Sequence, residues 1–167
     1  MTTNNNITES DENFLKNFLK NFYHKIIDTE DFNTFEDISI KWMKNELENN
    51  DKDPESLLKM MQNHKRHQIW FTSIMGFFYQ HGIGCKVDKN NALEIYLYII
   101  VNEEKFIYLN TGKIHLFTLN NIIGKYLLSL YYYKDIIIDK KYLLQWNKKY
   151  ASNGKPLTKD QLGNYSE

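Results

Sequence analysis

Apolar side chains recur along most of the chain at steps of three and four residues, which is the spacing of one face of an α-helix. The first stripe predicts a helix that ends near Asp28, and a second stripe follows it. The first stripe contains Phe14, Leu15, Phe18, Leu19, Phe22 and Ile26, and the second contains Phe35, Ile38, Trp42, Met43 and Leu47. Residues 1–11 are polar and have no such periodicity, so we expect a disordered lead-in.

Local signals place the helices that follow. Asp53 precedes Pro54, and an aspartate N-cap followed by proline in the first turn is a typical helix start. A short helix over about 54–63 would bury Leu57, Leu58 and Met61. Further helices are predicted over about 68–81, 89–103, 106–134 (as one or two helices) and 140–152. Because proline and glycine are scarce and no hairpin dipeptide separates alternating strands, we predict an all-α fold.

The most specific pattern surrounds a glycine-rich turn. Two helical stripes flank Gly82 and Gly84, and Asp88 stands just before the second stripe. Glycine permits positive φ where the first helix ends, and Asp88 can cap the start of the next helix. Gly76 and Ala92 remove side-chain bulk from the facing surfaces, so the two helix axes can approach closely. The pattern therefore predicts two helices packed side by side and joined by a glycine turn.

Eight residues of this segment match a known repeat pattern at fixed spacing. They are Met75, Gly76, Tyr79, Gly82, Gly84, Asp88, Ala92 and Tyr96. In this order they resemble the Sel1-like repeat, a relative of the tetratricopeptide repeat. Departures from the pattern stand at Phe71, Cys85, Ile95, Ile99, Ile100 and Glu103. The resemblance implies a right-handed αα-superhelix of helical hairpins, and it implies a non-catalytic role as an adaptor or scaffold in protein complexes.

A weaker copy of the same spacing follows and sets the predicted organisation of the chain. Gly124, Leu128, Ser129 and Tyr132 match its first half, and Asp139, Leu143, Trp146, Ala151 and Gly154 match its second half. The turn between the halves is two residues shorter and lacks glycine, so this copy is degenerate. We divide the chain into a disordered lead-in (1–11), an N-terminal helical cap (12–65), a first repeat (66–103), an insertion (104–121), a degenerate second repeat (122–154) and the start of an incomplete third repeat (155–167).

The resemblance also implies where a partner would bind. In stacked hairpins the first helix of each pair lines a concave surface. By that geometry we expect exposed partner-binding positions at Thr72, Ser73, Phe77, Tyr126 and Leu130. A solenoid normally needs three or more repeats and a terminal cap, so the predicted helix over 140–152 would be an open edge. The expected partner is another protein, or a second copy of the chain bound through this C-terminal edge.

The charges are balanced in total but unevenly distributed. The chain has 21 basic and 21 acidic residues, yet residues 1–63 have a net charge of −6 and residues 64–167 have a net charge of +6. Solvated helix faces are the simpler interpretation, and the functional alternatives are head-to-tail self-association or an anionic partner bound at the lysine-rich C-terminal half. Only one basic residue is arginine, the better side chain for reading nucleic acid. The C-terminal lysines, with Tyr131–Tyr133 and Trp146, leave a nucleic-acid-binding regulatory protein as the alternative function.

The sequence offers two patterns that could indicate a metal site or a catalytic site, and each lacks an essential part. His64, His67, His81 and Cys85 could form a zinc site, and His81 with Cys85 could form a thiol–imidazole pair. The zinc pattern lacks an opening cysteine pair, and the thiol lacks an oxyanion donor. We therefore expect no catalytic residue, metal or cofactor.

One cysteine permits no internal disulfide. The longest apolar run, residues 95–101, is far shorter than the roughly 18 residues of a membrane span. The polar N-terminus cannot form the apolar core of a signal peptide. We expect an intracellular, cytoplasmic protein that does not act at a membrane.

Overall fold

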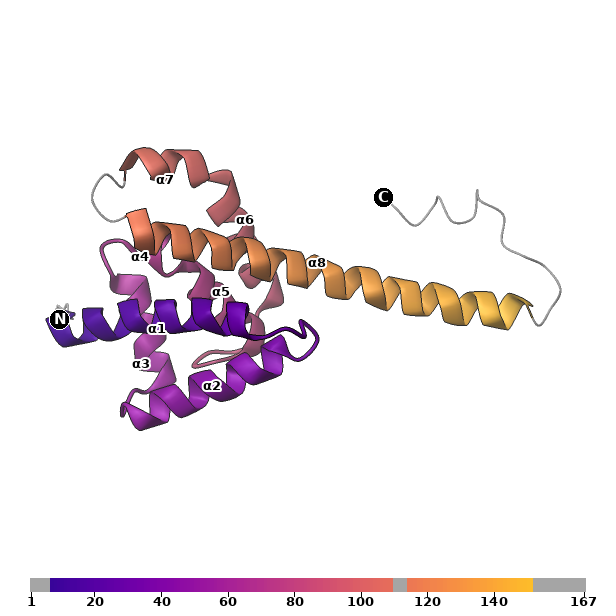
Figure 1. Ribbon diagram of the computed structural model, residues 1–167, viewed down its shortest axis with the longest axis horizontal. Coiled ribbons are helices and arrows are strands. Elements are labelled where there is room, and N and C mark those ends of the chain that lie inside the picture. Colours follow the sequence, from indigo (N-terminus) through magenta and orange to yellow (C-terminus); the bar gives the residue numbers. More distant parts are fainter. Residues whose placement is uncertain (1–6, 110–113, 152–167) are drawn as a thin grey trace. The chain divides into compact units, whose positions relative to one another are not determined.

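The computed structural model describes residues 7–109 and 114–151, and side chains over 7–107 and 115–134 (Figure 1). The described residues form helices and no strand, so the all-α prediction is confirmed. The chain divides into two units, Met1–Ser129 and Leu130–Glu167, and the packing described below lies within the first. The helices are α1 (Glu9–Asp28), α2 (Phe35–Asn49), α3 (Pro54–Asn63), α4 (His67–Trp70), α5 (Thr72–His81), α6 (Lys89–Val101), α7 (Glu103–Leu109) and α8 (Ile114–Ala151).

α1 begins inside the segment that was predicted to be disordered. Thr8 is its N-cap, and the Thr8 Oγ1 accepts a hydrogen bond from the backbone N–H of Asp11 at 3.1 Å. Glu9, Asp11 and Glu12 occupy the first turn, where negative charge is favourable to the helix dipole. The prediction of a disordered lead-in is therefore wrong for residues 9–11. The helix begins at its cap, Thr8, which precedes the first residue of the apolar stripe, Phe14. α1 buries Leu15, Phe18, Leu19 and Phe22.

α2 and α3 follow the apolar stripes closely. α3 has the predicted bounds, and its N-cap Asp53 accepts a hydrogen bond from the backbone N–H of Ser56 at 2.8 Å. All three predicted residues of α3 are buried, whereas in α2 Ile38 remains exposed and Trp42 is half-buried. The buried apolar residues are Phe35, Met43 and Leu47 in α2 and Leu57, Leu58 and Met61 in α3.

α5 lies at the centre of the first unit. The Phe77 ring centroid is 5.1 Å from that of Phe22 on α1 and 6.4 Å from that of Phe35 on α2. On the same helix, Phe78 meets Phe18 of α1 with ring centroids 6.4 Å apart. Every residue of α5 except Tyr79 and His81 is buried. A helix that is apolar on most sides is thus enclosed by its neighbours.

The predicted pair of helices with a glycine turn is present as α5 and α6. Gly82 and Gly84 both have a φ of 67°, in the left-handed region where glycine is strain-free. Asp88 caps α6 by accepting the backbone N–H of Asn91 at 3.0 Å. A Cβ atom at Gly76 would overlap the ring of Tyr96, so the absence of a side chain permits the close contact.

The structure divides the predicted helix over 68–81 into α4 and α5. Phe71 separates them with a φ of −122° and a ψ of 2°. Asn120 of α8 lies at this break, where its Oδ1 accepts the backbone N–H of Ser73 at 2.9 Å and its Nδ2 donates to the carbonyl of Ile69 at 3.0 Å. In an unbroken helix these two backbone groups would bond to each other. The inserted amide therefore replaces one helical hydrogen bond and separates the two helices.

α8 also differs from the prediction. It runs without a break from Ile114 to Ala151, so the turn expected between residues 134 and 140, and with it the second hairpin, is wrong. No glycine or proline stands in residues 135–139 to end the helix. The predicted insertion over 104–121 contains all of α7 except its first residue, and the first residues of α8. The predicted third repeat lies outside the described residues.

Candidate interaction surface

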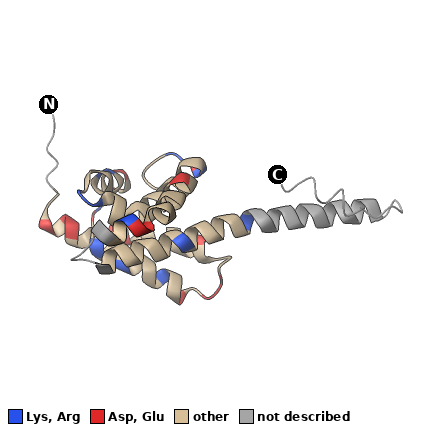
Figure 2. Ribbon diagram, turned by 90° about the horizontal axis from the view of Figure 1, so that it is seen from above, with Lys and Arg blue, Asp and Glu red and all other residues tan. Residues whose placement is uncertain are grey.

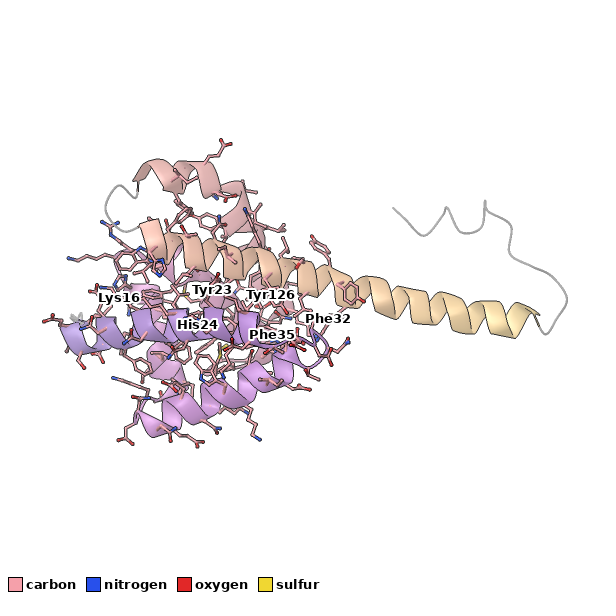
Figure 3. The ribbon with its side chains drawn as sticks, viewed as in Figure 1. Lys16, Tyr23, His24, Phe32, Phe35 and Tyr126 are labelled. Carbon is pink, nitrogen blue, oxygen red and sulfur yellow. The ribbon has the colours of Figure 1, made fainter. Side chains whose placement is uncertain are left out.

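The structure places most of the predicted partner-binding residues in the interior. The predicted residues are Thr72, Ser73, Phe77, Tyr126 and Leu130, of which Tyr126 is half-buried and the other four are buried. The prediction of exposure is therefore wrong for four of the five. The three residues on α5 are buried because neighbouring helices enclose most of this helix and leave only Tyr79 and His81 partly exposed. Tyr126 packs edge-on against Phe35 of α2, with ring centroids 5.0 Å apart (Figure 3).

Large apolar side chains are exposed on α6 instead. Leu97 and Val101 are one helical turn apart, and 38% and 80% of their surfaces are exposed. Tyr98, the neighbour of Leu97, is 37% exposed. We call these three residues the α6 face. The sequence showed this apolar run, but it could not show which of its side chains stay uncovered.

A hollow of about 350 Å³ lies between α7 and α8. Its apolar walls come from Ile107, Phe117 and Ile122, and Ile107 is 55% exposed. An aromatic series connects the hollow to the α6 face. Tyr98 contacts Phe106 with ring centroids 5.9 Å apart, and Phe106 contacts Phe117 at 6.3 Å. The full lining is Glu103, Ile107, Phe117, Thr118, Asn121, Ile122 and Lys125.

One ion pair stands at the rim of the hollow. Lys125 Nζ lies 2.9 Å from Oε1 and 2.8 Å from Oε2 of Glu103, and the side-chain amide of Asn121 donates to the same carboxylate. The hydrogen bond from Lys125 is the main reason that the pKa of Glu103 is lowered, so the carboxylate is ionised at neutral pH. The rim thus has no net charge, and the walls are apolar. This combination suits an apolar side chain of a partner better than a charged small molecule.

A buried polar network connects α2, α5 and α6. The Tyr96 hydroxyl donates to Gln80 Oε1 at 2.8 Å, and Gln80 Nε2 donates to Glu36 Oε1 at 3.3 Å. His81 Nε2 lies 3.9 Å from the same carboxylate oxygen. Because these groups come from three helices, the network fixes how the hairpin sits against α2.

Cys85 makes a structural contact. Its Sγ donates to the carbonyl of Phe78 at 3.5 Å. Burial raises the pKa of the Cys85 thiol, and the negative charge of Asp88 raises it further. The thiol is therefore held in its protonated, weakly nucleophilic form, which does not suit the thiol–imidazole chemistry considered for this residue.

His64 is buried among aromatic rings. Its Nδ1 accepts the backbone N–H of Arg66 at 3.0 Å, and its ring lies 5.3 Å from Trp70 and 5.1 Å from Phe71. Within 7–107 and 115–134, no three His, Cys, Asp or Glu side chains are grouped so that they could hold a metal ion. The imidazole of His64 therefore acts in packing.

The residues of the nucleic-acid alternative are only partly described. Tyr132 and Tyr133 are 46% and 42% exposed, and Tyr131 is half-buried. The side chains of Trp146 and of the lysines at 140, 141, 148, 149, 155 and 159 lie outside the described residues. Among the described helices, none combines the length and apolarity that crossing a bilayer requires.

No protein-family model matches this chain, and neither a curated protein nor a solved structure is significantly similar to it. The resemblance to the Sel1-like repeat therefore rests on the eight residues between Met75 and Tyr96 that carry the pattern.

Proposed function

We propose that this protein is a non-catalytic adaptor that binds a partner protein through the α6 face and the adjoining hollow. The observation that carries this proposal is the exposure of Leu97, Tyr98 and Val101 beside an apolar hollow. Contiguous apolar surface of this kind marks interaction sites in proteins. An anchor side chain of the partner would enter the hollow, and the surrounding contacts would exclude water from it.

The Sel1-like resemblance supports the same role. In proteins built from stacked helical hairpins, each hairpin buries its outer face against a neighbour. α6 is the second helix of the hairpin that carries the repeat pattern, and its outer face is exposed. In the proposed complex a helix of the partner packs on this face, as the next hairpin of a stacked array would. A cytoplasmic location belongs to the same proposal.

Site-specific photo-crosslinking tests the adaptor role. A benzophenone amino acid replaces Val101 on the α6 face or, as a matched control, Lys44, which is exposed on α2. We expect a discrete protein adduct from position 101 after irradiation in native cell extract. Adding Leu97→Asp should remove most of that adduct, because a carboxylate would have to be desolvated on binding, while circular dichroism stays unchanged.

Equal adducts from both positions, or no adduct from position 101, would refute the role of the α6 face. An adduct that disappears after nuclease digestion would favour the second candidate, a nucleic-acid-binding protein. The observation that favours this candidate is the exposure of Tyr132 and Tyr133, whose rings could stack on unpaired bases.

A further inference from the structure

The corner that joins α1 to α2 carries a second set of exposed apolar side chains. Ile27, Phe32 and Ile38 are 57%, 38% and 43% exposed. Ile27 precedes the last residue of α1, Phe32 lies in the connection, and Ile38 lies in the first turns of α2. Figure 3 shows Phe32 in this connection, near the labelled Phe35. This corner belongs to other helices than the α6 face.

Exposed carboxylates accompany these apolar residues. Asp28, Glu30, Asp31 and Asp37 are all exposed, and Asp and Glu are red in Figure 2. Within the part of the chain that the structure describes, no ion pair involves any of the four. We define the acidic corner as these four carboxylates together with the three apolar residues named above.

Asp31 stabilises the turn between α1 and α2 through hydrogen bonds. Its Oδ1 accepts the backbone N–H of Asn33 at 2.9 Å, and its carbonyl accepts the backbone N–H and the hydroxyl of Thr34 at 3.1 and 3.0 Å. Asp28 and Glu30 make no such bond among the described residues. Their charges can therefore be changed without disturbing the turn.

The chain itself contains a segment of complementary chemistry. Residues 134–151 carry five Lys against two Asp, and they interleave these charges with apolar residues. This segment is helical, since α8 extends to Ala151. The imbalance continues across the whole sequence, because residues 1–63 have a net charge of −6 and residues 64–167 have a net charge of +6. A basic, apolar helix is the kind of partner that an acidic, apolar corner fits.

We propose that the acidic corner binds the 134–151 segment of a second copy of this chain, so that copies associate head to tail. The contact joins two different surfaces, and it can close into a reciprocal dimer or continue into longer assemblies. Attraction between the oppositely charged surfaces favours the encounter and weakens as salt screens the charges. An adaptor that assembles in this way would present several copies of its α6 face. The inference goes beyond the proposed function, because it uses a different surface.

Sedimentation velocity of the full chain tests this inference. At low ionic strength we expect the mean mass to rise with concentration, and at high ionic strength to fall towards the monomer mass of 20.1 kDa. Asp28→Lys with Glu30→Lys should weaken self-association at least about tenfold, because attraction becomes repulsion. Lys140→Glu with Lys141→Glu should have the same effect. An equimolar mixture of the two double variants should associate again, because one keeps the intact segment and the other keeps the intact corner.

A matched control separates this contact from a general effect of charge. Glu46→Lys with Glu48→Lys makes the same change in net charge at the other end of α2 and should leave self-association unchanged. The inference is overturned if the wild-type chain stays monomeric at every concentration, if the control variant dissociates equally, or if the mixture stays monomeric. Crosslinking from position 101 does not depend on the acidic corner. Its result therefore tests the proposed adaptor role and leaves the self-association inference to the sedimentation experiment.

Discussion

Asn120 shows how much one buried side chain can contribute to this fold. It is 1% exposed and makes four hydrogen bonds, to the backbone N–H and hydroxyl of Ser73, to the carbonyl of Ile69 and to the hydroxyl of Thr72. Its two donor hydrogens and its acceptor oxygen are therefore all engaged. A polar group that is fully satisfied in the interior fixes one arrangement of the helices around it.

Replacing Asn120 by leucine should therefore destabilise the protein strongly. Asn120→Leu keeps the branched shape and the number of heavy atoms of the side chain but leaves the N–H of Ser73 and the carbonyl of Ile69 without partners in the interior. At about 1–3 kcal/mol for each of the two unpaired groups, we expect the free energy of unfolding in urea to fall by about 2–6 kcal/mol. Asn90→Leu, at an exposed position of α6, should change it by less than about 0.5 kcal/mol. Equal effects of the two substitutions would contradict the role given to Asn120.

At the scale of elements, two glycines determine how closely helices approach. Gly76 of α5 faces the ring of Tyr96 on α6, and Gly124 of α8 faces Ile99 on the same helix. A Cβ atom at Gly124 would lie 2.8 Å from Ile99 Cδ1, which is the flexible end of its side chain. At Gly76 the obstacle is the fully buried ring of Tyr96, which also donates a hydrogen bond to Gln80. The two contacts therefore differ in how easily they can adjust.

Alanine substitutions at Gly76 and Gly124 should differ in their effect, because the contact with Tyr96 is rigid and the contact with Ile99 can adjust. We expect Gly76→Ala to lower the free energy of unfolding by about 1–3 kcal/mol, since the Tyr96 ring cannot move without losing its hydrogen bond. Gly124→Ala should be close to neutral, because Ile99 can change its rotamer and alanine favours the helix by up to about 1 kcal/mol. Thermal and urea unfolding of both variants give the comparison. The opposite order of effects would show that α6 is held differently in solution.

For the whole molecule, His64 makes stability depend on pH. It is the C-cap of α3, contacts the rings of Trp70 on α4 and Phe71, and its Nε2 lies 3.9 Å from a carboxylate oxygen of Glu12 on α1. Burial lowers the pKa of His64 below its ordinary 6.5, although the charge of Glu12 opposes the shift. The unfolded chain consequently takes up the proton first as the pH falls. The stabilisation by neutral His64 is present above 6.5 and is lost progressively as the pH falls from 6.5 towards the lower pKa of the folded state.

Removing this imidazole should remove the corresponding part of the pH dependence. We expect the wild-type chain to lose stability between about pH 7 and about pH 5, and His64→Gln to lose distinctly less over the same interval. His24→Gln, at an exposed position of α1, should keep the wild-type slope. Urea unfolding at the two pH values measures both slopes. Identical slopes for the wild-type chain and His64→Gln would show that other groups control the acid sensitivity.

Most of the helices could be predicted because their signals are local. Asp53 before Pro54 gave the start of α3, and Gly82, Gly84 and Asp88 gave the turn between α5 and α6. Caps, left-handed glycines and a 3.6-residue period act between residues a few positions apart, so a single sequence contains them in full. The class of fold followed from these elements.

The interaction surface could be predicted much less well. The apolar run over residues 95–101 was visible, but nothing in it distinguished the buried Ile99 from the exposed Val101. Thr72, Ser73 and Phe77 were expected on a surface and lie in the interior, because the helices that enclose α5 come from distant parts of the chain. Exposure depends on what covers a side chain, and a repeat pattern does not contain that information.

The sequence by itself thus determined where α3 and α6 begin, that the chain is all-α, and that a glycine turn joins α5 to α6. Only the tertiary structure decided that Phe71 interrupts a predicted helix, since the amide responsible, on Asn120, is 47 residues from the Ser73 group that it binds. The tertiary structure also decided which apolar helix faces are buried by other helices and which remain exposed. The physical reason is that hydrogen bonding and burial of a residue depend on neighbours in space, whereas caps and periodicity depend on neighbours in sequence.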